Sequence, residues 1–150
     1  MIPKSKWRQY GQPGNRAKGI IIHNTNSPKT AEQLEKWLSN ENKGSNGCHF
    51  LVDSNEVRKV MPLNWSVYSV GNGASFGNLD CIAIEICTNP SEREYSKAEQ
   101  KGIELIRELM AKYDMGKEQI FFHRDFQANV NCPAQIIKRY GTKARFLNGL

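Results

Sequence analysis

Residues 18–23 read KGIIIH, and residues 81–87 read CIAIEIC. Each is an apolar run that carries one charged or titratable side chain near its end, and such runs are typical of strands buried on both faces of a sheet. A third run, residues 120–123 (IFFH), repeats the pattern and again ends in histidine. Because amphipathic helical segments alternate with these runs, the sequence predicts an α/β fold with a central mixed β-sheet flanked by α-helices.

The helical segments carry recognisable start and stop signals. Thr30 forms a capping box with Gln33 and starts the first helix. The second helix is expected to begin at Ser96, which has a glutamate three positions on, and to end near Gly116. A short last helix is expected over 133–140, because proline suits the first turn of a helix.

A hairpin and a long loop occupy the middle of the chain. Residues 48–52 and 56–61 are expected to be strands, and Asp53-Ser54-Asn55 between them is a turn signal. Residues 62–80 are expected to form a long loop, and loops of this length in compact domains are often functional. A second, polar turn is expected over 88–95.

Length and composition predict one domain over residues 1–150, with residues 1–17 as a polar N-terminal arm lying on it. The chain has 150 residues and is 39% hydrophobic, which suits a single core. No run approaches the roughly 20 apolar residues that span a bilayer, so membrane insertion is not expected. The basic N-terminus lacks a following apolar segment, and we therefore expect no signal peptide.

The chain carries a formal net charge of +6 at pH 7. This charge indicates either a simply basic surface or an anionic polymeric partner such as nucleic acid, membrane or cell wall. No long basic run is interleaved with aromatic residues, and nucleic acid is therefore the weaker interpretation. The four cysteines include no CxxC pair, and reduced thiols are expected.

Two histidines and one cysteine stand at the predicted ends of elements. His23 and His123 each close an apolar run, and Cys132 directly precedes the helix expected from Pro133. A helix N-terminus lowers the pKa of a thiol, which favours the thiolate that metals bind. Two imidazoles and one thiolate would leave one tetrahedral position of zinc open, as in catalytic sites. The spacing of His23 and His123 alone does not show that they share one site. A single histidine at a strand end is more often structural than a metal ligand.

Glu85 lies inside the apolar run of residues 81–87, where a carboxylate is costly unless it is paired or faces a cavity. One interpretation is a structural glutamate that bridges to arginine or lysine. The other is a general base with a raised pKa beside a metal. The residues alone favour neither interpretation.

Five motifs resemble, in their order and spacing, the type 2 N-acetylmuramoyl-L-alanine amidases. This family includes phage endolysins and bacterial autolysins and is related to the peptidoglycan recognition proteins. The resemblance covers roughly residues 18–140. The motifs are HNT at 23–25, CHFLVD at 48–53, the loop at 65–73, IAIEIC at 82–87 and HRD to CP at 123–133.

The resemblance implies the peptidoglycan recognition protein/amidase type 2 fold and one Zn²⁺ per domain. It implies hydrolysis of the amide between N-acetylmuramic acid and L-alanine in bacterial peptidoglycan. Carried over, Glu85 is the catalytic residue, and His49 and Trp65 are substrate-binding residues, although a structural role for His49 is equally open. The implied metal ligands are His23, His123 and Cys132.

Three positions depart from the family pattern. Val130 stands where many relatives have a lysine that can stabilise the oxyanion, and Cys48 stands where an aromatic residue is common. The loop after Trp65 is also longer than usual. The oxyanion donor is therefore open, with three candidates nearby: Arg124, Asn129 and Asn131.

Several functions remain open at this point. The resemblance favours a phage endolysin that acts as a monomer, reaching the cell wall from the host cytoplasm. The main alternative is a non-catalytic peptidoglycan receptor on the same fold, which the valine at position 130 weakly favours. A nucleic-acid binder and an intracellular amidase that recycles wall fragments are further alternatives.

Overall fold

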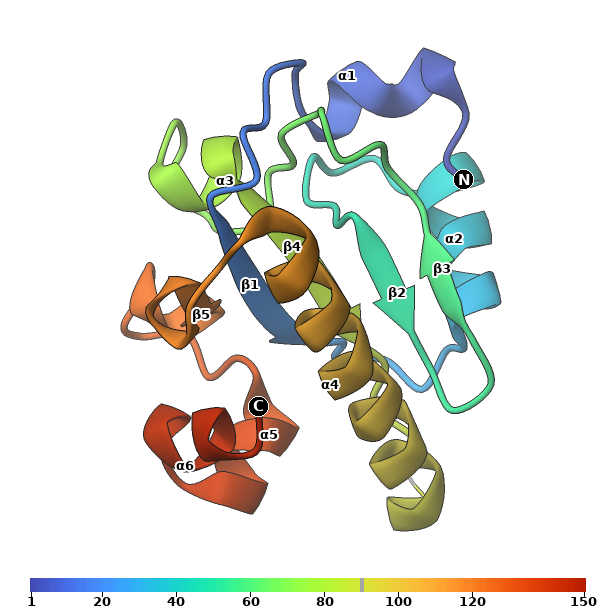
Figure 1. Ribbon diagram of the computed structural model, residues 1–150. Coiled ribbons are helices and arrows are strands. Elements are labelled where there is room, and N and C mark those ends of the chain that lie inside the picture. The colour runs from blue at the N-terminus through green and yellow to red at the C-terminus, as the bar shows by residue number, and fades with distance from the viewer. Residues whose placement is uncertain (90) are drawn as a thin grey trace.

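The computed structural model describes residues 1–89 and 91–150, and within them one five-stranded sheet forms the centre of the molecule (Figure 1). The strand order is β3-β2-β4-β1-β5. Strands β2, β4, β1 and β5 run parallel, and β3 pairs antiparallel with β2. The bounds are β1 Gly19–Asn24, β2 Phe50–Val52, β3 Val57–Lys59, β4 Cys81–Ile86 and β5 Ile120–Phe122. The predicted mixed α/β fold is confirmed.

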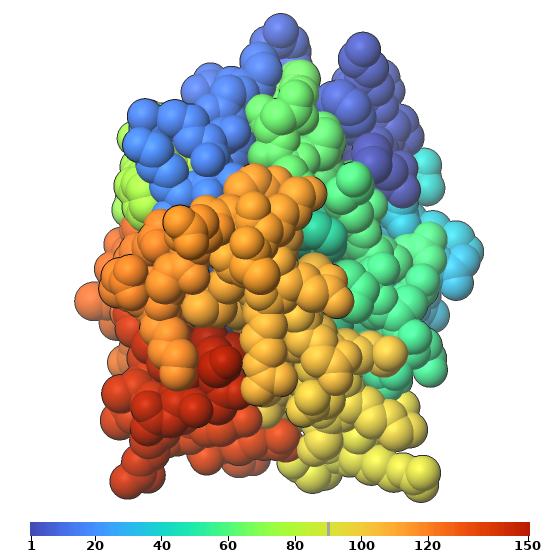
Figure 2. Space-filling view, viewed as in Figure 1, coloured from blue at the N-terminus to red at the C-terminus, as the bar shows by residue number. Residues whose placement is uncertain are grey.

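Helices cover both faces of the sheet. On one face lie α1 (Trp7–Tyr10), α2 (Ala31–Asn40) and α3 (Phe76–Asp80). On the other lie α4 (Glu92–Tyr113), α5 (Ala134–Tyr140) and α6 (Lys143–Asn148). Figure 2 shows this second face, where the yellow-to-orange side chains of α4 cover the sheet beside the red C-terminal helices. None of the described helices is long and apolar enough to cross a membrane.

Alternation along the two central strands decides which side chains face which layer. Ile82, Ile84 and Ile86 of β4 pack in one core cluster with α4, α5 and α6. Because successive side chains of a strand point to opposite faces, Glu85 faces the α2 layer. The register pairs Glu85 with His23 on β1 and with Leu51 on β2. One row across the sheet therefore presents these three side chains on the same face.

The second long helix begins earlier than the sequence predicts. Helix α4 starts at Glu92, and the hydroxyl of Ser91 accepts the Glu94 N–H, so the expected start at Ser96 is wrong. Both serines have a glutamate three positions on, and burial of Tyr95 in the core selects the earlier start. The predicted turn over 88–95 therefore ends before Glu92, and its Pro90 lies outside the described residues.

The ends of the other elements are partly as predicted. The capping box of Thr30 is present, and Gly141 closes α5 in a left-handed conformation with φ of 76°. Helix α4 is capped instead by Asp114, whose φ is 52°, so Gly116 is not its cap. The sequence did not predict three short helices, namely α1, α3 and α6.

Candidate metal centre

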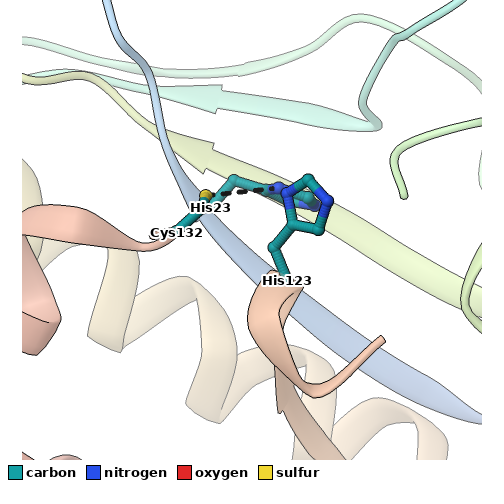
Figure 3. Close-up of side chains that lie close together, drawn as sticks. All are labelled: His23, His123 and Cys132. Carbon is teal, nitrogen blue, oxygen red and sulfur yellow. Dashed lines mark hydrogen bonds between the residues drawn. The ribbon is translucent and has the colours of Figure 1, made fainter. Parts of the chain in front are cut away.

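The structure brings His23 together with His123 and Cys132, which lie 100 and 109 residues further along the chain (Figure 3). One ligand atom of each lies within 4.8 Å of the others. The two imidazole rings meet edge to face with centroids 4.8 Å apart, and Cys132 Sγ lies 3.7 Å from His23 Nδ1. Two nitrogen donors and one sulfur donor therefore converge on one point.

Backbone elements hold these three side chains in place. His23 is the penultimate residue of β1, and His123 opens a single 3₁₀ turn directly after β5. Cys132 lies just before α5, whose first turn is tied to β1 by Asn24. The Asn24 Oδ1 accepts the backbone N–H groups of Gln135 at 2.9 Å and of Ile136 at 3.2 Å. The start of α5 is therefore fixed beside the end of β1, and Cys132 with it.

Glu85 lies next to this cluster on β4. Its Oε1 is 4.0 Å from His23 Nδ1, and the side chain keeps 25% exposure. Burial raises the pKa of Glu85 to about 8, because desolvation disfavours the carboxylate. Its Oε2 has no hydrogen-bond partner among the described residues. Within the described residues, Glu85 forms no salt bridge with a lysine or an arginine. The structural interpretation, in which Glu85 pairs with such a cation, therefore lacks its partner.

The donor set fits a transition metal such as zinc. The His23 ring is buried, and desolvation together with His123 lowers its pKa to about 3, so the ring is neutral at pH 7. Its Nε2 has no hydrogen-bond partner among the described residues. Two imidazoles and a cysteine sulfur form the mixed nitrogen and sulfur set that zinc binds in proteins.

The expected lowering of the Cys132 pKa by a helix N-terminus is wrong. Burial raises the pKa of this thiol to about 12, and the negative charge of Glu85 raises it further. Desolvation of the thiolate outweighs the effect of the helix N-terminus, since α5 is only seven residues long. The metal-free thiol is therefore protonated at pH 7, and a bound cation is what would deprotonate it.

A groove of about 800 Å³ opens above the row formed by His23, Glu85 and Leu51. Apolar side chains of α2 form one wall, and the segment from Val130 to Gln135 forms another. The α2–β2 connection also lines the groove, with five residues: Asn42, Gly44, Asn46, Gly47 and Cys48. The sequence did not predict that this asparagine- and glycine-rich stretch lines a groove.

The loop after Trp65 contributes less to the groove than predicted. Of residues 65–76, Ser69 lines the groove, whereas Trp65 packs against Trp7 with ring centroids 5.3 Å apart. His49 is fully buried: its Nδ1 accepts the Ala83 N–H at 2.9 Å, and its Nε2 lies 2.8 Å from the Trp65 carbonyl. Contacts among the described residues do not support substrate binding by His49 or Trp65, and that role stays a prediction.

The three oxyanion candidates differ in their positions. Asn131 lines the groove together with Val130. Arg124 and Asn129 are exposed and do not line the groove within the described part of the chain.

The fold and this site agree with a sequence match over most of the chain. Residues 13–135 match the N-acetylmuramoyl-L-alanine amidase family (Amidase_2), and the chain therefore belongs to this family.

Individual relatives give the same result. The chain is 29% identical over 139 residues to the N-acetylmuramoyl-L-alanine amidase CwlA of Bacillus subtilis (strain 168), covering 91% of this chain and 50% of CwlA. It superposes on PlyL with a TM-score of 0.89 at 24% identity, covering 98% and 91% of the two chains. For a mutant endolysin from Bacillus subtilis the TM-score is 0.85 at 27% identity, with 97% and 94% covered. The chain spans half or less of the curated relatives it matches.

Proposed function

We propose that this chain is a zinc-dependent amidase that hydrolyses the amide between N-acetylmuramic acid and L-alanine in bacterial peptidoglycan. The observation that carries the proposal is the convergence of three metal-ligating side chains and Glu85 on the floor of one groove. Residues 1–150 would act as one catalytic domain, with residues 1–17 as its N-terminal arm.

His23, His123 and Cys132 would hold the zinc ion. A zinc ion held by three protein ligands supplies Lewis acidity, which lowers the pKa of water and polarises carbonyl groups. The neutral imidazole of His23 needs no deprotonation before it binds. The thiol of Cys132, with its raised pKa, must lose its proton, so zinc affinity is expected to fall at acidic pH.

Glu85 would act as the general base and then the general acid. Its side chain keeps 25% exposure beside the cluster and would accept a proton from the attacking water. The same carboxyl group would return that proton to the leaving amine of L-alanine. A cation within about 4–6 Å favours the ionised form of a carboxylate, which offsets the effect of burial on Glu85.

The groove would hold a glycan strand and its attached peptide. A volume of about 800 Å³ is large enough for a disaccharide with the first residues of a peptide. Apolar contacts with Leu34, Trp37 and Leu38 would exclude water from that side of the scissile bond. The similarity to an endolysin supports a phage endolysin that acts on the cell wall, and we propose that it acts as a monomer.

Zinc stoichiometry and wall lysis test this proposal together. The parent protein is expected to bind one zinc per chain and to clear suspensions of purified cell walls. Cys132→Ala is expected to lose both properties, whereas Cys81→Ala, a buried cysteine outside the groove, is expected to keep both. If the Cys132→Ala variant kept full zinc content and full lysis, the ligand assignment would be wrong. Wall binding without lysis by the zinc-loaded parent would favour a receptor.

A further inference from the structure

The side-chain amide of Gln127 lies between a metal-ligand candidate and a distant loop. Its Oε1 is 2.7 Å from His123 Nε2 and accepts the backbone N–H of Gly71 at 2.9 Å. Gln127 lies one turn after His123, and its own N–H donates to the His123 carbonyl at 3.2 Å. One amide oxygen thus joins the imidazole that follows β5 to the loop that precedes α3.

These contacts determine the orientation of the amide and the tautomer of the imidazole. The backbone N–H of Gly71 can only donate, so the atom facing it must be the oxygen of the Gln127 amide. An amide oxygen can only accept, so His123 Nε2 must carry a proton. In the neutral ring, the lone pair that binds a metal is then on Nδ1.

The backbone around Gln127 leaves little freedom for another arrangement. A Cβ atom at Gly71 would lie 2.6 Å from Gln127 Nε2 and 3.1 Å from its Cδ, so the loop approaches the amide as closely as glycine allows. Val70, the neighbour of Gly71, is held by the Oδ1 of Asn78, which accepts its N–H at 2.9 Å. The acceptor therefore cannot drift away from the imidazole without breaking contacts of the loop.

We propose that Gln127 is a positioning residue that holds His123 in its Nε2–H tautomer and so presents Nδ1 to the metal. Ligating histidines usually donate their second ring N–H to an acceptor, and loss of that acceptor typically lowers metal affinity about 10- to 100-fold. This inference rests on the proposed function, because it takes His123 to be a zinc ligand. It adds that the loop at Gly71 supports the metal centre through Gln127.

Three variants and two measurements test the role of Gln127. Gln127→Leu removes the acceptor, Gln127→Glu keeps an acceptor oxygen, and Gln100→Leu removes an exposed amide on α4 as a control. The ring ¹⁵N shifts of His123 in zinc-free protein report the tautomer, and competition with a chelator reports the zinc Kd. We expect the parent, Gln127→Glu and Gln100→Leu to show the Nε2–H form. We expect Gln127→Leu to lose this preference and to raise the Kd about 10- to 100-fold.

The outcomes separate this inference from the proposed function. An Nδ1–H tautomer in the parent, or a Gln127→Leu variant with an unchanged Kd, would overturn the role of Gln127. A parent that shows the Nε2–H form but binds no zinc would overturn the proposed function while leaving the hydrogen-bond assignment intact. If Gln127→Leu does not fold, Gly71→Ala replaces it. Its added Cβ displaces the amide, and we expect the Kd to rise in the same direction.

Discussion

Glu85 is the residue whose replacement best separates hydrolysis from binding. Glu85→Gln keeps the size of the side chain and removes the proton acceptor. General acid–base catalysis contributes about 10²- to 10⁴-fold, so the rate of wall hydrolysis is expected to fall by that factor. Zinc content and binding to insoluble peptidoglycan are expected to match the parent, because Glu85 is not proposed as a ligand. Lysis, bound zinc and wall pull-down are measured on one preparation.

Glu99 offers a matched control for Glu85. It is also buried and also has one oxygen without a partner in the described residues, but it lies on α4 and bonds to Tyr140 and Arg139. Glu99→Gln is expected to lower the melting temperature and to leave the rate of hydrolysis per folded molecule unchanged. If the two variants lost hydrolysis equally, or if Glu85→Gln kept near-normal lysis, Glu85 would not be the general base.

Protonation of His49 is expected to lower the stability of the fold in mild acid. Burial lowers its pKa from 6.5 to about 4, and its Nδ1 already accepts the Ala83 N–H, so a proton there would break that bond. Because the folded pKa lies below the unfolded value, this stabilising contribution is present above pH 6.5 and is lost as the pH falls towards 4. His23 acts in the same direction.

Urea unfolding with a chelator present measures the effect of His49. His49→Gln is expected to make the free energy of unfolding less dependent on pH between 6.5 and 4, by up to about 1.4 kcal/mol per pH unit. If the free energy of unfolding depended on pH equally in the parent and the variant, protonation of His49 would not destabilise the fold.

The sequence indicates the metal-ligand candidates but not the residues that support them. His23, His123 and Cys132 were visible because each borders an apolar run or a proline. Gln127 was missed because its role depends on a contact with Gly71, 56 residues away. The raised pKa of Cys132 was also missed, since burial is a property of the folded chain.

At the scale of elements, α1 supports one wall of the groove. The Tyr10 hydroxyl donates to the Leu38 carbonyl at 2.6 Å and accepts from Asn42 Nδ2 at 3.2 Å. The Gln9 amide donates to the carbonyls of Asn42 and Gly44 at 2.9 and 2.8 Å. The N-terminal segment therefore holds the α2–β2 connection that lines the groove.

Tyr10→Phe is expected to weaken this wall without disturbing the metal. The variant leaves the Leu38 carbonyl without its donor, which costs about 1–3 kcal/mol of stability for a buried group. We expect KM for soluble wall fragments to rise and zinc content to stay at one per chain. Tyr113→Phe, on the far end of α4, is the matched control. A stability loss with no change in KM would limit Tyr10 to a structural role.

The predicted helices and strands were most accurate where only one local sequence pattern could mark the start or extent of the element. The capping box at Thr30 and the buried runs of β1 and β4 each offered one interpretation, and the structure confirms them. The start of α4 had two serine caps five residues apart. The choice between them depends on Tyr95, which packs in the core and whose hydroxyl accepts from Asn24, a contact that no local pattern records.

At the scale of the whole molecule, the charge of +6 is expected to help the protein find anionic cell walls. Exposed charges are screened over about 8 Å at 0.15 M ionic strength, so lysis of intact walls is expected to weaken as salt rises. Hydrolysis of a small soluble fragment is expected to change less, because diffusion to a charged polymer is not involved. A rate of lysis that stays constant from low to high salt would show that the net charge does not help the protein reach the wall.

The α/β fold class followed from the order of strands and helices, whereas the groove did not. Parallel strands with buried runs predict an α/β fold, since helices must cover both faces. The groove forms between α2, the α2–β2 connection and the segment before α5, which meet only after folding. Its lining residues therefore could not be read from spacing.

The most direct test of the central claim is the bond that is cut. Zinc-loaded protein is incubated with purified peptidoglycan, and new α-amino groups of L-alanine and new reducing sugar ends are both quantified. We expect new alanine amino groups, no new reducing ends, and a strongly reduced yield with Glu85→Gln. Binding to the walls without any new alanine amino groups would contradict the central claim.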